Sequence, residues 1–126
     1  MPARRYTLPR SARLKGDKLI RRVISGRTRL TRGPITLLAT SNDLGMLRLG
    51  IRTPRAVGTA AVRNRIRRLL REAFRLARSD FVFGQDVMLL VRPHAPLMLA
   101  DYQKLLSGLL VKLRARVSEK PESPTC

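Results

Sequence analysis

Residues 50–74 read GIRTPRAVGTAAVRNRIRRLLREAF and contain the end of a strand, a bend and most of the longest helix. Pro54 and Gly58 mark the bend, and Thr59 is suited to cap a helix over about residues 59–78. With a turn of about 100° per residue, this helix has one apolar stripe, which a folded domain buries against another element. The stripe consists of Val62, Ile66, Leu69, Leu70, Ala73 and Ala77.

The opposite side of this helix is almost wholly cationic. Its band consists of Asn64, Arg67, Arg68, Arg71, Arg75 and Arg78, with Arg63 and Arg65 at the edges. Like charges three or four residues apart each cost a few tenths of a kcal/mol, and Glu72 is the only acid between residues 63 and 78. A phosphate backbone would relieve this repulsion, because a guanidinium binds phosphate bidentately or stacks on a base. The band therefore favours RNA binding over the plain alternative of a solvated helix face.

Apolar periodicity predicts the other elements. A short helix begins at Asp17 and is stopped by Gly26, and a last helix runs over about residues 99–117. After a basic linker, strands are expected at residues 35–40, 47–52 and 87–91.

The strand at residues 47–52 has two unlike faces. Apolar Leu47, Leu49 and Ile51 alternate with Arg48, Gly50 and Arg52. One face of the sheet therefore packs, and the basic face meets solvent or a ligand.

The length of the chain limits its organisation. A chain of 126 residues suffices for one domain with a core and is too short for two. We expect this RNA-binding domain at residues 1–117, beginning with a basic segment at residues 1–16. The polar residues 118–126, which include two prolines, are expected to be a disordered tail.

Charge and cysteine content narrow the class of protein. Lys and Arg total 27 against 8 acids, and the resulting net charge of +19 points to a polyanionic partner. Cys126 is the only cysteine, so we expect no disulfide and no cysteine metal site, which fits a cytoplasmic protein. No apolar run approaches the roughly 20 residues of a membrane span, and residues 1–15 lack the apolar region of a signal peptide. A membrane-surface protein is a weaker interpretation, because the chain has no Trp.

The residues that could perform catalysis are few. His94 is the only histidine, and between Pro93 and Pro96 we interpret it as a loop residue without a role. Asp80 and Asp86 could suggest a metal pair, but a hard cation takes at least six oxygen ligands. Caps or turn residues are the preferred interpretation of both, and no catalytic residue is expected on the chain.

Residues 50–74 resemble the signature of the protein subunit of bacterial ribonuclease P, with Arg63, Asn64 and Arg65 as its Arg-Asn-Arg box. The resemblance extends over roughly residues 10–115. It implies an α/β (α+β) two-layer sandwich with a small mixed sheet, in the order α-β-β-(β)-α-β-α, and a left-handed β-α-β crossover. It also implies one protein copy per catalytic RNA, which removes the 5′ leader of precursor tRNA with Mg²⁺ ions held by the RNA. No cofactor is expected on the protein itself.

The resemblance also implies two binding surfaces. The catalytic-RNA surface would comprise Arg55, Arg63, Asn64, Arg65, Arg67, Arg68, Arg71 and Arg75. The leader surface would comprise Ile20, Val23, Ile24, Arg48 and Arg52, in a groove between the first helix and the sheet.

Two positions depart from the family pattern. The family usually has aromatic residues where Ile20 and Ile24 stand, so stacking worth about 1–3 kcal/mol per base would be replaced by weaker aliphatic contact. Ala56 follows Arg55 where the family commonly has a second basic residue, which leaves Arg55 alone at that place. Core packing is an equally good interpretation of Ile20, Val23 and Ile24.

Two other classes of protein share the basic composition. A ribosomal or ribosome-assembly protein would bind ribosomal RNA, and a nucleoid protein would bind chromosomal DNA. The nucleic acid that copurifies with the chain discriminates among the three.

Overall fold

The computed structural model describes residues 12–13, 16–26, 28–81 and 83–119. The helices are α2 (Asp17–Ile24), α3 (Ala60–Ala77) and α4 (Leu99–Glu119), and the strands are β1 (Thr28–Arg32), β2 (Ile35–Ser41), β3 (Leu47–Arg52) and β4 (Gln85–Val91). Two short 3-10 helices, η2 (Arg55–Val57) and η3 (Arg78–Asp80), flank α3. Residues 120–126 of the expected tail and most of the basic N-terminal segment lie outside the described residues. Ser118 and Glu119, which were expected to belong to the disordered tail, are the last residues of α4.

The four strands form one mixed sheet in the order β1-β2-β4-β3. β2 pairs antiparallel with both β1 and β4, whereas β3 and β4 are parallel neighbours joined through α3. The expected mixed sheet with packed helices is confirmed. The left-handedness of the β3-α3-β4 crossover stays a prediction.

β1 is the element that differs from the sequence expectation, which placed a basic linker before residue 35. Residues Thr28–Arg32 instead form an edge strand that pairs with β2. Leu30 is the only buried side chain of this strand, so it has too little apolar alternation to be predicted.

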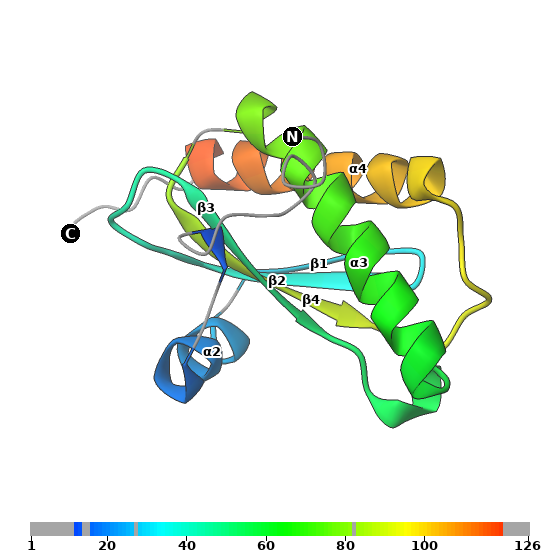
Figure 1. Ribbon diagram of the computed structural model, residues 1–126. Helices are drawn as coiled ribbons and strands as arrows, with labels where there is room; N and C mark the ends of the chain where they lie inside the picture. Colours follow the sequence, from blue (N-terminus) through cyan, green and yellow to red (C-terminus); the bar gives the residue numbers. More distant parts are fainter. Residues whose placement is uncertain (1–11, 14–15, 27, 82, 120–126) are drawn as a thin grey trace, which may run out of the picture.

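The helices cover both faces of the sheet, as Figure 1 shows: α3 and α4 lie on one face, and α2 lies on the other. Successive residues of a strand point to opposite faces, so Leu37 of β2 faces α3 and α4 while Leu38 faces α2. The sheet is thus apolar on both sides along β2 and β4, which explains their nearly continuous apolar sequences.

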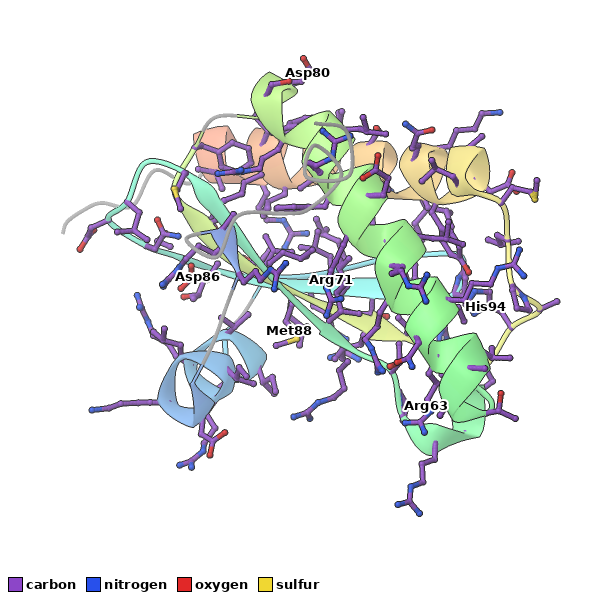
Figure 2. The ribbon with its side chains drawn as sticks, viewed as in Figure 1. Arg63, Arg71, Asp80, Asp86, Met88 and His94 are labelled. Atoms are coloured by element: carbon purple, nitrogen blue, oxygen red, sulfur yellow. The ribbon has the colours of Figure 1, made fainter. Side chains whose placement is uncertain are left out.

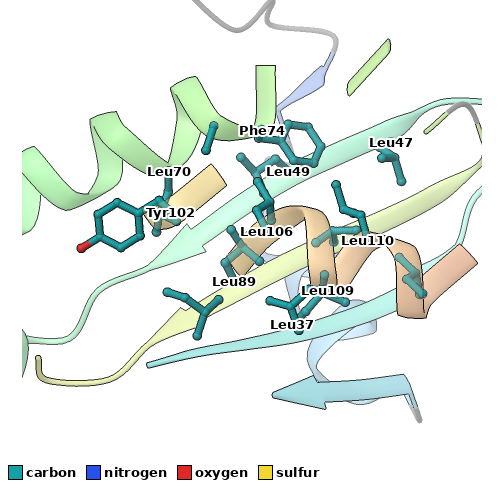
Figure 3. Packing of buried hydrophobic residues seen from close by; sticks show 14 of the residues in the cluster. Leu37, Leu47, Leu49, Leu70, Phe74, Leu89, Tyr102, Leu106, Leu109 and Leu110 are labelled. Carbon is teal, nitrogen blue, oxygen red and sulfur yellow. The ribbon is translucent and has the colours of Figure 1, made fainter. Parts of the chain in front are cut away.

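The larger core lies between the sheet and the helices α3 and α4. Figure 3 shows its packing, in which fully buried Leu70, Phe74 and Tyr102 approach the strand residues Leu37, Leu47, Leu49 and Leu89. Burying side chains of this size contributes about 1.5–3 kcal/mol each. α3 is therefore held on its apolar side, and its other sides are free to present charge.

Gly26 ends α2 for a reason other than the one expected. Its backbone is not among the positive-φ glycines, and Ser25 caps the helix by donating its N–H to the Arg21 carbonyl. A Cβ on Gly26 would lie 3.0 Å from the Ala39 carbonyl oxygen, so the glycine permits the chain to pass close to β2.

Candidate RNA interface

α3 is anchored by its cap and by its buried face. The Thr59 hydroxyl accepts a hydrogen bond from the Val62 N–H at 3.2 Å, which confirms the expected cap. The side chains that α3 buries, against α4 and the sheet, are Ile66, Leu70, Ala73 and Phe74. This anchoring fixes the direction in which each arginine of the helix points.

The most exposed residues of the predicted surface are Asn64, Arg65 and Arg68 on α3 and Arg55 on η2. The first turn of α3 contains no acid, so the positive end of the helix dipole there adds to the charge of the arginines. A phosphate could approach these groups without displacing any part of the fold.

Arg67 is half-buried and held in place by polar neighbours. It donates to the Thr53 hydroxyl at 2.5 Å and also to the side-chain oxygen of Asn64. Both partners are neutral, so Arg67 is oriented while its charge stays uncompensated. Thr53 is a contributor to this surface that the helix pattern alone could not reveal.

Arg71 lies between α3 and β3, as Figure 2 shows, and it is surrounded by like charges. Burial lowers the pKa of Arg71, and the nearby cations Arg13 and Arg67 lower it further. Arginine stays protonated even so. The folded chain thus holds a charge whose energy an approaching anion would lower. Arg13, whose backbone forms an isolated parallel β-bridge with Leu49, was not among the predicted residues, because its segment has no apolar periodicity.

Arg63 contributes a buried donor at the start of α3. Its Nε atom is inaccessible to solvent and is the one buried side-chain nitrogen or oxygen without a hydrogen-bond partner in the described part of the chain. Such a group costs about 1–3 kcal/mol when it is left unsatisfied. Arg63 and Arg71 point from the same side of α3 (Figure 2).

Arg75 differs from the other arginines of the helix because Glu72 neutralises it. Its Nε and Nη2 atoms donate to the two Glu72 carboxylate oxygens at 3.0 and 2.8 Å. The predicted cationic band therefore becomes weaker toward the C-terminal end of α3.

The second predicted surface lies on the opposite face of the sheet, where α2 covers β2 and β4. Val23 is fully buried there against Leu38 and Met88, so it belongs to the core and does not reach the surface on which it was expected to meet RNA. Ile20 is half-buried beside this cluster, and Ile24 is 37% exposed. The two isoleucines, but not Val23, can contact a ligand.

Arg48 of β3 takes part in a buried ion pair. Its Nε and Nη2 atoms each lie 2.8 Å from an oxygen of Asp86, and the Asn42 amide donates to the same carboxylate at 2.7 Å. The hydrogen bonds that Arg48 donates to the fully buried Asp86 raise the pKa of Arg48. The charge of Arg48 is thus compensated within the fold. Of the two predicted β3 arginines, Arg52 is the exposed one.

Asp86 is neither a cap nor a turn residue, contrary to the sequence interpretation, because it lies within β4 directly opposite Arg48. Asp80 does lie in a turn, η3, well away from Asp86 (Figure 2). In the described ranges, no three His, Cys, Asp or Glu side chains are grouped so as to hold a metal ion.

His94 has a structural role, contrary to the interpretation from the sequence. Its ring nitrogens lie 2.7 Å from the Arg92 carbonyl and 2.7 Å from the hydroxyl of buried Tyr102, which also accepts from the Leu97 N–H. Desolvation raises the pKa of Tyr102. These bonds hold the loop between β4 and α4, and no nucleophile is placed beside the imidazole by them.

None of the helices in the described residues combines the length and the apolar character needed to cross a membrane. A mixed sheet backed by helices, with a long helix that presents oriented and uncompensated arginines, defines a small basic RNA-binding protein of the α+β class.

Comparison with known proteins narrows this class. The family model for ribonuclease P matches residues 8–115. The ribonuclease P protein component of Syntrophus aciditrophicus is 30% identical over 93% of this chain and 99% of the relative. That of Desulfovibrio desulfuricans is 34% identical over 95% of this chain and 94% of the relative. The structure of the ribonuclease P protein from Thermotoga maritima superimposes with a TM-score of 0.70 at 25% identity, covering 79% of this chain and 96% of that one.

The chain belongs to the ribonuclease P protein family. Its function is that of the protein subunit of this endoribonuclease ribonucleoprotein, in RNA binding and tRNA processing. A ribosomal or ribosome-assembly protein is not favoured by these matches.

Proposed function

We propose that the arginine surface of α3 binds the catalytic RNA subunit and that a separate strip beside α2 binds the 5′ leader of precursor tRNA. One protein copy would act per catalytic RNA, and the Mg²⁺ ions would be held by the RNA. The observation that carries the proposal is the group of cations on α3, in which Arg67 is oriented by Thr53 and Asn64 and lies near Arg71.

The α3 surface suits a folded RNA because some of its arginine side chains are held in one orientation and others can change conformation. Arg67 is oriented by the hydrogen bonds that it donates to Thr53 and Asn64. Oriented donors lose little entropy on binding phosphate, while exposed Arg65 and Arg68 can adapt to its path. Contacts of this kind position an RNA without reading its sequence.

The α2 strip suits a single strand of varied sequence. It combines the aliphatic side chains of Ile20 and Ile24 with Gly50 and Arg52 of the neighbouring edge strand β3. Aliphatic contact to bases and a cation for the backbone do not depend on base identity. With Val23 buried and Arg48 compensated by Asp86, the contact area is smaller than the five predicted residues implied.

One experiment separates the two surfaces. Ile24→Asp places a carboxylate on the exposed strip, and Leu44→Asp is its matched control, because Leu44 is 52% exposed in the turn between β2 and β3. With protein saturating over the catalytic RNA, Ile24→Asp should weaken precursor binding and leave mature tRNA binding nearly unchanged, whereas Leu44→Asp should affect neither. Equal losses for both forms of tRNA would exclude the leader assignment.

The same assay tests α3. Arg68→Ala should weaken assembly with the catalytic RNA and affect precursor and mature tRNA alike, because Arg68 faces away from α2. The protein without RNA should not cleave precursor tRNA with any metal ion, and adding the catalytic RNA should restore cleavage. Cleavage by the protein alone would contradict the proposed division of labour.

A further inference from the structure

A second row of cations runs along α4, away from the α3 surface. Lys104, Lys112 and Arg116 are exposed and follow one another at multiples of four residues on this helix. Steps of four residues advance about 6 Å along a helix, with a small drift around its axis. The row lacks a side chain at one step, because residue 108 is a glycine.

Arg32 of β1 fills the missing step. A Cβ on Gly108 would lie 2.9 Å from each of three guanidinium atoms of Arg32, namely Cζ, Nε and Nη1. Three equal distances mean that the plane of the guanidinium lies across the position that a Cβ of residue 108 would occupy. Glycine in a helix interior costs about 0.5–1 kcal/mol relative to alanine, so this glycine keeps a place for the cation at the expense of helix stability.

The completed row, Lys104, Arg32, Lys112 and Arg116, is uncompensated. In the part of the chain that the structure describes, none of these four side chains has an ion-pair partner. Asp101 is an acid beside the row, and its carboxylate accepts the Met98 N–H at 3.2 Å at the start of α4.

A cavity of about 370 Å³ opens at the N-terminal end of the row. Its apolar lining is Pro34, Leu97 and Leu105, and its polar lining is Arg32, Lys104 and Asp101. Arg92 steadies the adjacent turn by donating to the Gly33 carbonyl at 2.8 Å. An apolar cavity of this size with cations at its rim matches an unpaired base whose phosphate stays outside.

We propose that this β1–α4 surface is a second RNA-binding surface, which holds a single strand with its phosphates along the row and one unpaired base in the cavity. β1 and β3 form opposite edges of the sheet, so an RNA bound at α3 and β3 leaves the row accessible. The proposal goes beyond the two surfaces above and needs neither of them to be correct. The strand could come from the catalytic RNA or from the precursor tRNA.

Lysine acetylation followed by mass spectrometry tests the proposal directly, because the chain has only five lysines and two of them, Lys104 and Lys112, are in the row. The full-length protein is acetylated alone, with catalytic RNA, and with catalytic RNA plus precursor or mature tRNA. Protection of both lysines by catalytic RNA alone assigns the strand to that RNA. Protection that requires tRNA assigns it to the substrate. Reactivity equal to that of the free protein in every arm overturns the proposal.

Variants give a second readout that separates this surface from α3. Lys104→Gln with Lys112→Gln should make the log-log salt dependence of RNA binding shallower by about 1.4, at about 0.7 per phosphate contact. Lys18→Gln, on the outer side of α2, is the control for general loss of charge. If the pair changes the slope no more per charge than Lys18→Gln does, the row does not bind RNA, whatever Arg68→Ala shows for α3.

Gly108→Ala tests the role of Arg32 without removing any charge. The added Cβ displaces the guanidinium, so RNA binding should lose about one contact, or about 0.7 in slope, while the melting temperature is maintained or rises. Ser107→Ala is the control on the neighbouring residue and should change neither. Unchanged RNA binding by a folded Gly108→Ala would show that Arg32 acts only in packing.

Discussion

The arginines of α3 and the arginine of β3 carry the same charge in opposite surroundings. Arg48 on β3 meets both oxygens of the buried Asp86, whereas Arg71 on α3 meets the cations Arg13 and Arg67. The first arrangement satisfies the charge within the fold, and the second leaves it to be satisfied by a ligand. A net charge of +19 therefore does not say which arginines are available to a ligand, and the local surroundings of each arginine distinguish them.

The largest effect is expected on the free energy of unfolding when Arg48 loses its ion-pair partner. Asp86→Ala leaves Arg48 without its counterion and should lower the free energy of unfolding by about 3 kcal/mol, the scale for breaking a buried ion pair. Urea denaturation measures this loss. Asp80→Ala, at an exposed position in η3, is the control and should change the free energy of unfolding by less than about 0.5 kcal/mol. Similar small losses for both would mean that Arg48 is hydrated and available to RNA.

Removing uncompensated arginines should act on RNA binding. Arg68→Ala with Arg71→Ala should make the log-log salt dependence of catalytic-RNA binding shallower by about 1.4. Arg75→Ala should change this salt dependence less than Arg68→Ala alone or Arg71→Ala alone does, because Glu72 already neutralises Arg75. Filter binding over a range of salt concentrations gives the slopes. Equal slopes for wild type and the double variant would show that α3 does not face the RNA.

Removing the ion-pair partner of Arg75 should change the salt dependence of RNA binding in the opposite direction. Glu72→Gln removes the carboxylate that neutralises Arg75 and should steepen the salt dependence by up to about 0.7, with tighter binding of the catalytic RNA at low salt. The same filter-binding series measures it. Weaker binding by a folded Glu72→Gln would indicate that Glu72 serves RNA recognition by orienting Arg75.

The smallest effect is expected on stability at Arg71. Arg71→Met keeps the aliphatic contacts but removes the repulsion from Arg13 and Arg67, so the free energy of unfolding should rise by about 0.3–0.5 kcal/mol at low salt. Because salt screens charges, the gain should shrink at high ionic strength. Denaturation at two salt concentrations checks this. A loss of stability at low salt would show that the charge of Arg71 is already satisfied in the folded chain.

The sequence predicted the orientation of the long helix α3 but not that of the short helix α2. The helix period identified the apolar and cationic sides of α3, and the structure keeps both. On α2, a helix of eight residues, neighbouring positions differ in role: Val23 is fully buried and Ile24 is 37% exposed. With so few turns, the periodicity does not define the rotation of the helix closely enough to separate them.

The sequence by itself determined the features that depend on near neighbours in the chain. These are the start and end of α3, its Thr59 cap, the alternation along β3 and the arginine band, because helix period, capping and strand alternation act over a few residues. The run through the Arg-Asn-Arg box also sufficed to indicate the family.

Only the tertiary structure decided which charges meet. Arg48 and Asp86 are 38 residues apart and pair through the parallel register of β3 and β4. β1 becomes a strand by pairing with β2, and Arg32 reaches Gly108 because α4 packs over β1. Strand register and helix packing are set by burial across the whole domain. Charges distant in the chain are therefore paired or left free by the fold, and no local pattern records the result.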